Sequence, residues 1–145
     1  MKNTARAIIK FGNDYIFIKR EKKVNKELKV FYATVGGHLD EGEDFEEACI
    51  REVYEELGIH VQIDRIFHEE YVYELDKYEK FYIVKYIDGE LGTGKGEEFT
   101  NIDIDKYGKY EIARLNKNEL VEYNILPSII KDKLIKEIND EESWI

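Results

Sequence analysis

The sequence predicts an α+β protein or an α/β/α sandwich with a mixed β-sheet. Runs rich in β-branched and aromatic residues lie on both sides of one helical segment, and apolar residues recur every four positions near the C-terminus. A chain of 145 residues with 43% hydrophobic residues suits one domain with one core. Because no repeat or linker divides the chain, we expect residues 1–145 to form a single domain.

The first part of the chain is predicted to form strands. Residues 5–11 and 15–18 are β-prone, and the Gly12-Asn13-Asp14 segment between them is typical of a turn. Residues 29–35 predict a third strand, which leads into two consecutive glycines. The charged segment 21–27 is expected to be a loop.

After the central helix the chain again favours strands. Residues 60–63, 65–74 and 80–88 are rich in Ile, Val, Tyr and Phe, which favours β-structure. Residues 89–96 contain four glycines and predict a loop, and residues 107–115 predict a further strand.

The C-terminal part is predicted to be helical. Residues 117–122 favour a short helical turn, and Pro127 suits the first turn of a longer helix. Ile130, Leu134 and Ile138 are spaced by four, so we expect them to face a core.

Composition and charge exclude several classes of protein. The sequence contains no run of 18 apolar residues, so it predicts no membrane span. The N-terminus lacks the long apolar stretch that is typical of a signal peptide. The net charge of −10 argues against nucleic-acid binding. The single cysteine, Cys49, excludes an intrachain disulfide and fits a reducing compartment. We therefore expect a cytoplasmic protein.

The central helix carries acidic residues at spacings that place them together. On a helical wheel Glu52, Glu55 and Glu56 fall within an arc of about 100°, beside an apolar flank. Like charges three or four residues apart destabilise a helix. Mg²⁺ prefers oxygen ligands and is often held by a few carboxylates plus substrate phosphates. The spacing therefore favours a divalent cation site, with a solvated acidic helix as the alternative.

Glycines flank this helix on both sides. Gly36 and Gly37 permit a close approach of backbone to a ligand, and Gly58 lies where a C-terminal cap belongs. Arg51 lies beside Glu55 on the wheel and can hold a carboxylate or the preceding loop.

The segment 37–59 resembles the Nudix box, G-x5-E-x7-R-E-U-x-E-E-x-G-U, where U is aliphatic. All nine specified positions match: Gly37, Glu43, Arg51, Glu52, Val53, Glu55, Glu56, Gly58 and Ile59. The resemblance to this MutT-like hydrolase family implies an α/β/α sandwich. It also implies hydrolysis of a nucleoside diphosphate linked to another group, X, with Mg²⁺ or Mn²⁺ as the cofactor.

The resemblance also implies roles for individual residues. Glu52 and Glu56 would be the chief metal ligands, and Glu55 would be a third ligand or the base. The Gly36 carbonyl would complete the coordination shell. A small-molecule nucleotide would be the partner, and homodimers are common in the family.

Two further residues complete the expected site. Arg51 would brace the loop before the helix, together with Glu43. The expected catalytic residues are Arg51, Glu52 and Glu55. Glu98 is the candidate for an additional metal-ligating carboxylate from outside the box, with a plain exposed loop as the alternative.

The resemblance leaves the substrate open. A pyrophosphatase acting on (d)NTPs is slightly favoured over an ADP-ribose or dinucleoside polyphosphate hydrolase. A non-catalytic nucleotide-binding module is a further alternative, although the intact box argues against it. A Nudix-fold isomerase would need a catalytic cysteine, and Cys49 on the apolar side of the helix is poorly placed for that role.

Overall fold

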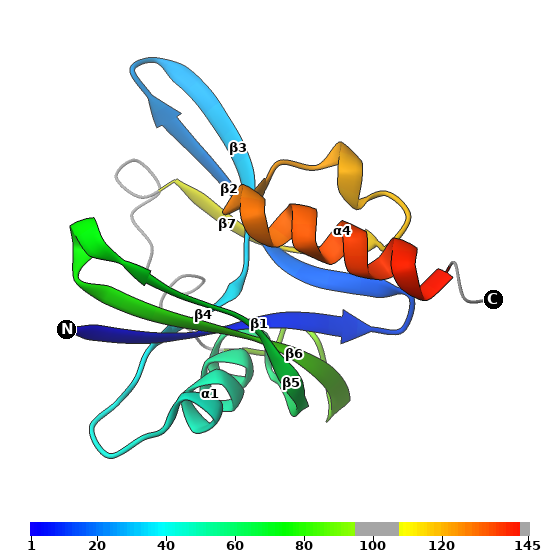
Figure 1. Ribbon diagram of the computed structural model, residues 1–145. Coiled ribbons are helices and arrows are strands. Elements are labelled where there is room, and N and C mark those ends of the chain that lie inside the picture. The colour runs from blue at the N-terminus through cyan, green and yellow to red at the C-terminus, as the bar shows by residue number, and fades with distance from the viewer. Residues whose placement is uncertain (95–107, 143–145) are drawn as a thin grey trace.

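The computed structural model describes residues 1–94 and 108–142. Within these ranges the strands form one mixed sheet, and the helices lie on its two faces (Figure 1). The strands are β1 (Lys2–Phe11), β2 (Asp14–Val24), β3 (Glu27–Ala33), β4 (Val35–His38), β5 (Ile59–Val72), β6 (Lys77–Gly89), β7 (Lys109–Asn116) and β8 (Ile125–Leu126). The helices are α1 (Phe45–Leu57) and α4 (Ser128–Glu142), with short 3₁₀ turns η1 (Tyr73–Leu75) and η2 (Leu120–Glu122).

The sheet forks along β1. Its main path runs β5-β6-β1-β2-β3-β8, while β4 pairs with β1 and β7 pairs with β2. β1 pairs with β2 through Ile9–Phe11 and with β4 through Thr4–Ala7. One edge of β1 therefore changes partner midway, and β2 turns away to pair with β3 and β7. The fork brings β4, β2 and β7 to the same part of the molecule.

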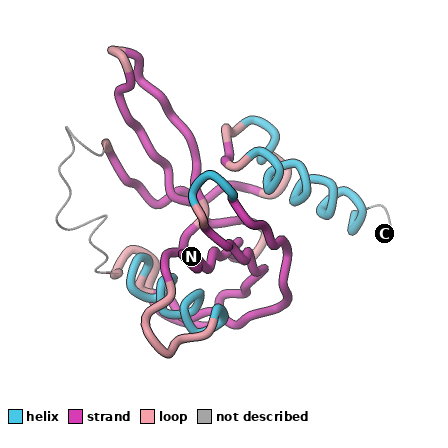
Figure 2. The backbone as a smooth tube through the Cα atoms, turned by 60° about the vertical axis from the view of Figure 1, so that its left-hand side comes forward, coloured by secondary structure: helices cyan, strands magenta, loops and turns pink. Residues whose placement is uncertain are grey.

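Apolar residues alternate between the two faces of the sheet, as the side-chain period of a strand requires. Ile8, Phe81 and Ile83 belong to the cluster that contains the apolar side of α4, whereas Ile9 and Val84 belong to the cluster that contains α1. Figure 2 shows the two helices on different sides of the strands. The predicted sandwich with a mixed sheet is confirmed.

The C-terminal helix packs as its sequence predicted. Ile130, Leu134 and Ile138 are buried in one cluster with large side chains of the sheet. Pro127 lies immediately before α4, next to the predicted position. The helical turn predicted over residues 117–122 is confined to η2.

The segment 21–27 is not a loop, so that prediction is wrong. β2 continues to Val24, and a two-residue turn at Asn25 and Lys26 leads into β3. Both turn residues have positive φ, 52° and 68°, which suits the right-handed twist of a hairpin. The backbone pairs across the two strands while most of the charged side chains remain exposed. A run of charged residues therefore suggested a loop where the chain forms a hairpin.

β5 joins two segments that the sequence predicted as separate strands. It pairs with β6 over its whole length, with shifts of register at three points. Such irregularities increase the local twist of a strand. No helix among residues 1–94 and 108–142 is long and apolar enough to cross a membrane.

Candidate active site

Local hydrogen bonds fix both ends of α1. Asp44 caps the N-terminus by accepting from the Glu47 backbone N–H at 2.8 Å, and the Glu47 side chain accepts from the Asp44 N–H at 3.1 Å. Gly58 ends the helix with φ of 78°, which confirms the predicted C-cap. The two caps thereby fix where α1 begins and ends, and with that which way its acidic side chains point.

Arg51 joins that loop to the helix. Its Nε donates to Glu43 Oε2 at 2.7 Å and its Nη2 donates to Glu43 Oε1 at 2.9 Å, a bidentate pair. Nη2 also donates to the His38 carbonyl at 3.0 Å. Hydrogen bonding by Arg51 lowers the pKa of Glu43, and the same contact raises the pKa of Arg51. These contacts hold residues 38–43 against α1.

The same guanidinium bridges two carboxylates of the helix. Nη1 donates to Glu52 Oε1 at 3.0 Å and to Glu55 Oε2 at 3.1 Å. Arg51 therefore supplies part of the positive charge that the acidic spacing requires. The Glu55 side chain is 50% exposed, whereas Glu52 is largely enclosed.

The two glycines of β4 provide room for close contacts. A Cβ at Gly37 would lie 2.7 Å from Glu52 Oε1, so the missing side chain lets the Glu52 carboxylate rest against the backbone. A Cβ at Gly36 would lie 2.1 Å from the Ala5 carbonyl oxygen, so this glycine permits the close approach of β4 and β1. Each glycine serves a distinct contact.

Glu56 faces a cavity of about 210 Å³ at the fork of the sheet. Its residue exposure is 7%, which is low for a carboxylate. Strands on both branches of the fork contribute to the wall. The cavity is lined by Arg6, Ile18, Arg20, Ala33, Thr34, Gly36, Glu56 and Tyr110. Gly36 and Glu56, two of the predicted metal ligands, thus share one cavity.

The predicted ligand set is only partly assembled. Glu52 and Glu55 contact Arg51, while Glu56 lies in the cavity. Within the described ranges, no group of three or more His, Cys, Asp or Glu side chains is arranged to hold a metal ion. Glu98 lies outside the described residues. The Glu56 carboxylate and the Gly36 carbonyl are nevertheless oxygen donors of the kind that a hard divalent cation requires.

Two arginines and a tyrosine complete the cavity. Three basic residues of β1 and β2 lie near this part of the sheet: Arg6, Lys19 and Arg20. Arg6 and Arg20 line the cavity, whereas Lys19 forms an ion pair with Glu21 at 3.4 Å.

Arg20 is held by aromatic stacking. Its guanidinium carbon lies 3.6 Å from the centroid of Tyr110 and 5.6 Å from that of Phe31. Sequence reasoning did not single out Tyr110. Its position on β7, opposite Arg20 on β2, follows from a strand pairing that the sequence did not reveal.

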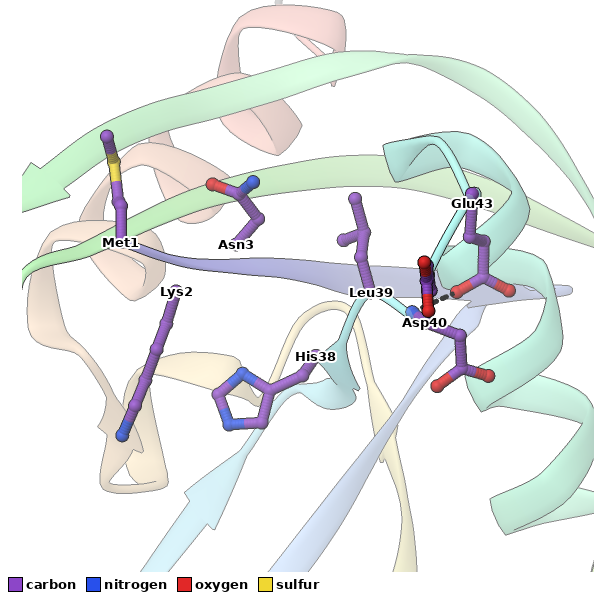
Figure 3. A pocket seen from close by; sticks show the side chains of 9 residues that line it. Met1, Lys2, Asn3, His38, Leu39, Asp40 and Glu43 are labelled. Atoms are coloured by element: carbon purple, nitrogen blue, oxygen red, sulfur yellow. Dashed lines mark hydrogen bonds between the residues drawn. The ribbon is translucent and has the colours of Figure 1, made fainter.

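A second cavity of about 450 Å³ lies beside the loop that Arg51 holds. Figure 3 shows Lys2 and His38 extending to one side, with Asp40 and Glu43 towards the other end. His38 Nδ1 lies 3.3 Å from Oγ1 of the buried Thr4. Thr4 pairs with His38 and Arg6 pairs with Gly36, so His38 in the wall of the second cavity and Gly36 in the wall of the first lie on the same face of the β1–β4 pair.

Cys49 is a core residue. It is fully buried, its Sγ contacts the Arg6 carbonyl at 3.8 Å, and burial raises the pKa of the thiol to about 12. A buried thiol that stays protonated is a poor nucleophile. The structure therefore gives no support to the isomerase alternative.

Comparisons with known proteins place this geometry in context. Residues 1–127 match the family model described as the NUDIX domain. No curated protein sequence shows a significant match to the chain.

Solved structures share the fold at low sequence identity. A NUDIX hydrolase from Nitrosomonas europaea superposes with a TM-score of 0.71 at 15% identity, covering 98% of this chain and 72% of that one. A MutT structure from work on Aliivibrio salmonicida and Vibrio cholerae gives 0.68 at 19% identity, covering 94% and 98%. An ADP-ribose pyrophosphatase from Streptococcus suis gives 0.63 at 13% identity, covering 94% and 90%.

Proposed function

The chain belongs to the Nudix hydrolase family, and from that premise we propose that it hydrolyses a (d)NTP as a pyrophosphatase at the fork of the sheet. Nudix hydrolases act on nucleoside diphosphates linked to X and generally use divalent metals.

One observation carries the proposal. The cavity at the fork is lined by Glu56 and Gly36 and also by two arginines, Arg6 and Arg20. Oxygen donors suit a hard cation, and guanidinium groups suit phosphate oxygens. With a cation held by the oxygen donors, a diphosphate in this cavity would contact both the cation and the guanidinium groups. Tyr110, which stacks on Arg20, keeps that guanidinium in place.

We assign the cation site to Glu52, Glu56 and the Gly36 carbonyl, with Glu55 as a third ligand or the base, Glu98 as a further ligand, and Mg²⁺ or Mn²⁺ as the ion. When bound, the ion supplies Lewis-acid polarisation of the diphosphate and activation of the attacking water. Arg51 orients Glu52 and Glu55 through the hydrogen bonds of Nη1. The Arg51–Glu43 pair keeps the loop with the two glycines close to α1.

The reaction forms one bond and breaks one. A water oxygen bonds to a phosphorus of the diphosphate, and the bond from that phosphorus to the bridging oxygen breaks. The bridging oxygen leaves with the other phosphate, and the water proton passes to a carboxylate. Glu55 is our candidate for this base, because its side chain is half exposed and can reach a water molecule.

The second cavity favours a second candidate substrate class. His38 in its wall lies on the same face of the β1–β4 pair as Gly36, and the cavity offers about 450 Å³ near His38 and Lys2. Substrates with a large X, such as ADP-ribose or a dinucleoside polyphosphate, would place X there.

Charge and cysteine content support two further parts of the proposal. The net charge of −10 favours a small nucleotide over nucleic acid as the partner. The buried, unpaired Cys49 favours a reducing, cytoplasmic setting.

The test is a screen of nucleotides with Mg²⁺ and with Mn²⁺, with products identified by ³¹P NMR. Glu56→Gln should lower kcat by about 100-fold or more, because it removes a charged oxygen donor from the cavity. Glu46→Gln, on the exposed side of the first turn of α1, is the matched control and should retain activity. Nucleotide binding without turnover by the unaltered protein would support the non-catalytic module instead.

A second comparison separates the two substrate classes. His38→Ala should raise KM for a substrate with a large X by roughly tenfold, because a polar contact in the second cavity is lost. The same variant should turn over a (d)NTP with little change. An equal effect on both substrates would show that the second cavity does not distinguish X.

A further inference from the structure

We propose that the loop of residues 90–94, which follows β6, positions Glu56 in the cavity at the fork, and that Gly94 is the positioning residue. Glu56 belongs to the assigned cation site, so the role given to Gly94 rests on the proposed function. The loop contacts the C-terminal end of α1, whereas Arg51 holds the loop that precedes the helix. Each end of the helix thus has its own support.

The loop contacts the end of α1 through backbone atoms. The Gly92 N–H donates to the Leu57 carbonyl at 2.9 Å, which gives a partner to one of the last carbonyls of the helix. Gly94 lies against the peptide group that joins Glu56 to Leu57. A Cβ at Gly94 would lie 2.3 Å from the Glu56 carbonyl carbon and 2.4 Å from its oxygen. A residue without a side chain is therefore needed for this close approach.

Thr93 holds the loop in shape. Its N–H and its hydroxyl both donate to the Glu90 carbonyl, at 3.2 Å and 2.7 Å. A Cβ at Gly58 would lie 2.1 Å from the Thr93 hydroxyl oxygen, so Thr93 packs against the C-cap of α1. Gly58 therefore serves two purposes, since it adopts a φ of 78° and leaves room for Thr93.

The contact matters because of the place of Glu56 in the helix. Glu56 is the last residue but one of α1, in the turn where helices fray most readily. To bind a cation together with the Gly36 carbonyl, its carboxylate must keep its place in the cavity. Glu52 and Glu55 are held in another way, by hydrogen bonds from Arg51. Disturbing the loop should therefore displace Glu56 and leave the other two carboxylates in place.

Gly92 provides a matched control two residues away from Gly94. Its φ is 99°, so an alanine there strains the backbone, but the added Cβ would meet nothing within 4 Å. Gly94 has the opposite properties, because its φ is not positive and the contact with Glu56 is what excludes a side chain. The two variants separate strain in the loop from displacement of Glu56.

Mn²⁺ binding to the chain without nucleotide, followed by the EPR signal of the free ion, tests the proposal. Gly94→Ala should raise the Kd for Mn²⁺ roughly tenfold, as changes behind a metal ligand typically do. Gly92→Ala should lower the melting temperature by roughly 3 °C and change that Kd by less than about twofold. An equal Kd for Gly94→Ala and the unaltered chain would overturn the proposal. Absence of Mn²⁺ binding by the unaltered chain would overturn the assigned cation site, and the role of Gly94 with it.

A double-mutant cycle tests whether Gly94 acts through Glu56. In a Glu56→Gln background, adding Gly94→Ala should weaken Mn²⁺ binding by less than about twofold, because the group that it displaces is already altered. A further loss of roughly tenfold in that background would show that Gly94 acts on the fold as a whole. That result would also overturn the proposal.

Thr93 offers a milder pair of variants, which decides the matter if Gly94→Ala fails to fold. Thr93→Val removes the hydroxyl that bonds to Glu90 and should raise the Kd for Mn²⁺ roughly threefold. Thr93→Ser retains the hydroxyl and should match the unaltered chain. Circular dichroism checks that both variants are folded. Equal Kd values for the valine and serine variants would contradict a positioning role for the loop.

Discussion

The two helices cover the two faces of the same sheet with different kinds of side chain. On the α1 side the contacts involve small residues, among them Ala5, Ala7, Ala48 and Cys49, all fully buried. On the α4 side the buried partners are large, including Phe17 and others of similar size. Small residues let a helix lie close to the strands, whereas large ones fill the space beneath a more distant helix.

This difference separates two tasks. The close approach of α1 lets Glu52 reach the backbone at Gly37 and lets Glu56 reach the cavity beside Gly36. α4 contributes no residue to the lining of that cavity and packs through Ile130, Leu134 and Ile138. We expect changes on the α4 side to lower stability, and small changes on the α1 side to lower activity first.

Leu134→Ala should have the largest effect on stability. The side chain is 1% exposed and lies within the apolar cluster beneath α4, so its truncation should cost about 3 kcal/mol of unfolding free energy. Urea denaturation measures the loss, and kcat at a temperature where the variant is folded should match the unaltered protein. A large fall in kcat with little loss of stability would contradict the division between the two faces.

Gly37→Ala should have a smaller effect, mainly on activity. The added Cβ would lie 2.7 Å from Glu52 Oε1, so the carboxylate must move away from its position beside Arg51. We expect kcat/KM to fall by roughly tenfold, equivalent to about 1.4 kcal/mol. Because the obstructing atom belongs to a flexible side chain, the melting temperature should change little.

Gly36→Ala is the informative contrast to that variant. Its Cβ would lie 2.1 Å from the Ala5 carbonyl, and backbone cannot yield as a side chain does. Stability should therefore fall together with activity. Equal stability of the two glycine variants would show that the approach of β4 to β1 tolerates a methyl group.

The Glu43–Arg51 pair should give the smallest effect on stability, and this effect should disappear in acid. The pKa of Glu43 is lowered by Arg51, so the pair stabilises the fold above the ordinary glutamate value of about 4.3 and loses that contribution as pH falls through the lowered pKa. Glu43→Gln should be less stable by at most about 1 kcal/mol at pH 7. The difference between the two proteins should shrink below about pH 4 in urea titrations. A difference that grows in acid would contradict this sign.

The local features were readable from sequence. Gly58 ended the helix where expected, and the spacing of Ile130, Leu134 and Ile138 marked the buried side of α4. Both depend on contacts between near neighbours in the chain, for which periodicity and capping rules hold. The family resemblance also rested on one continuous segment of the chain.

The cavity depended on contacts that no local rule describes. Arg20 and Tyr110 meet because β7 pairs with β2, and Arg6 joins them because β1 changes partner at the fork. The hairpin of β2 and β3 was missed for a related reason: its charged side chains suggested a loop, while backbone pairing made a strand.

The sequence alone determined the helix with its acidic positions, its caps and its family, because these are set by residues within a few turns of one another. The tertiary structure decided which carboxylate reaches the cavity and which arginines face it. Those contacts join strands that are far apart in the chain, so they exist only once the sheet has formed and forked.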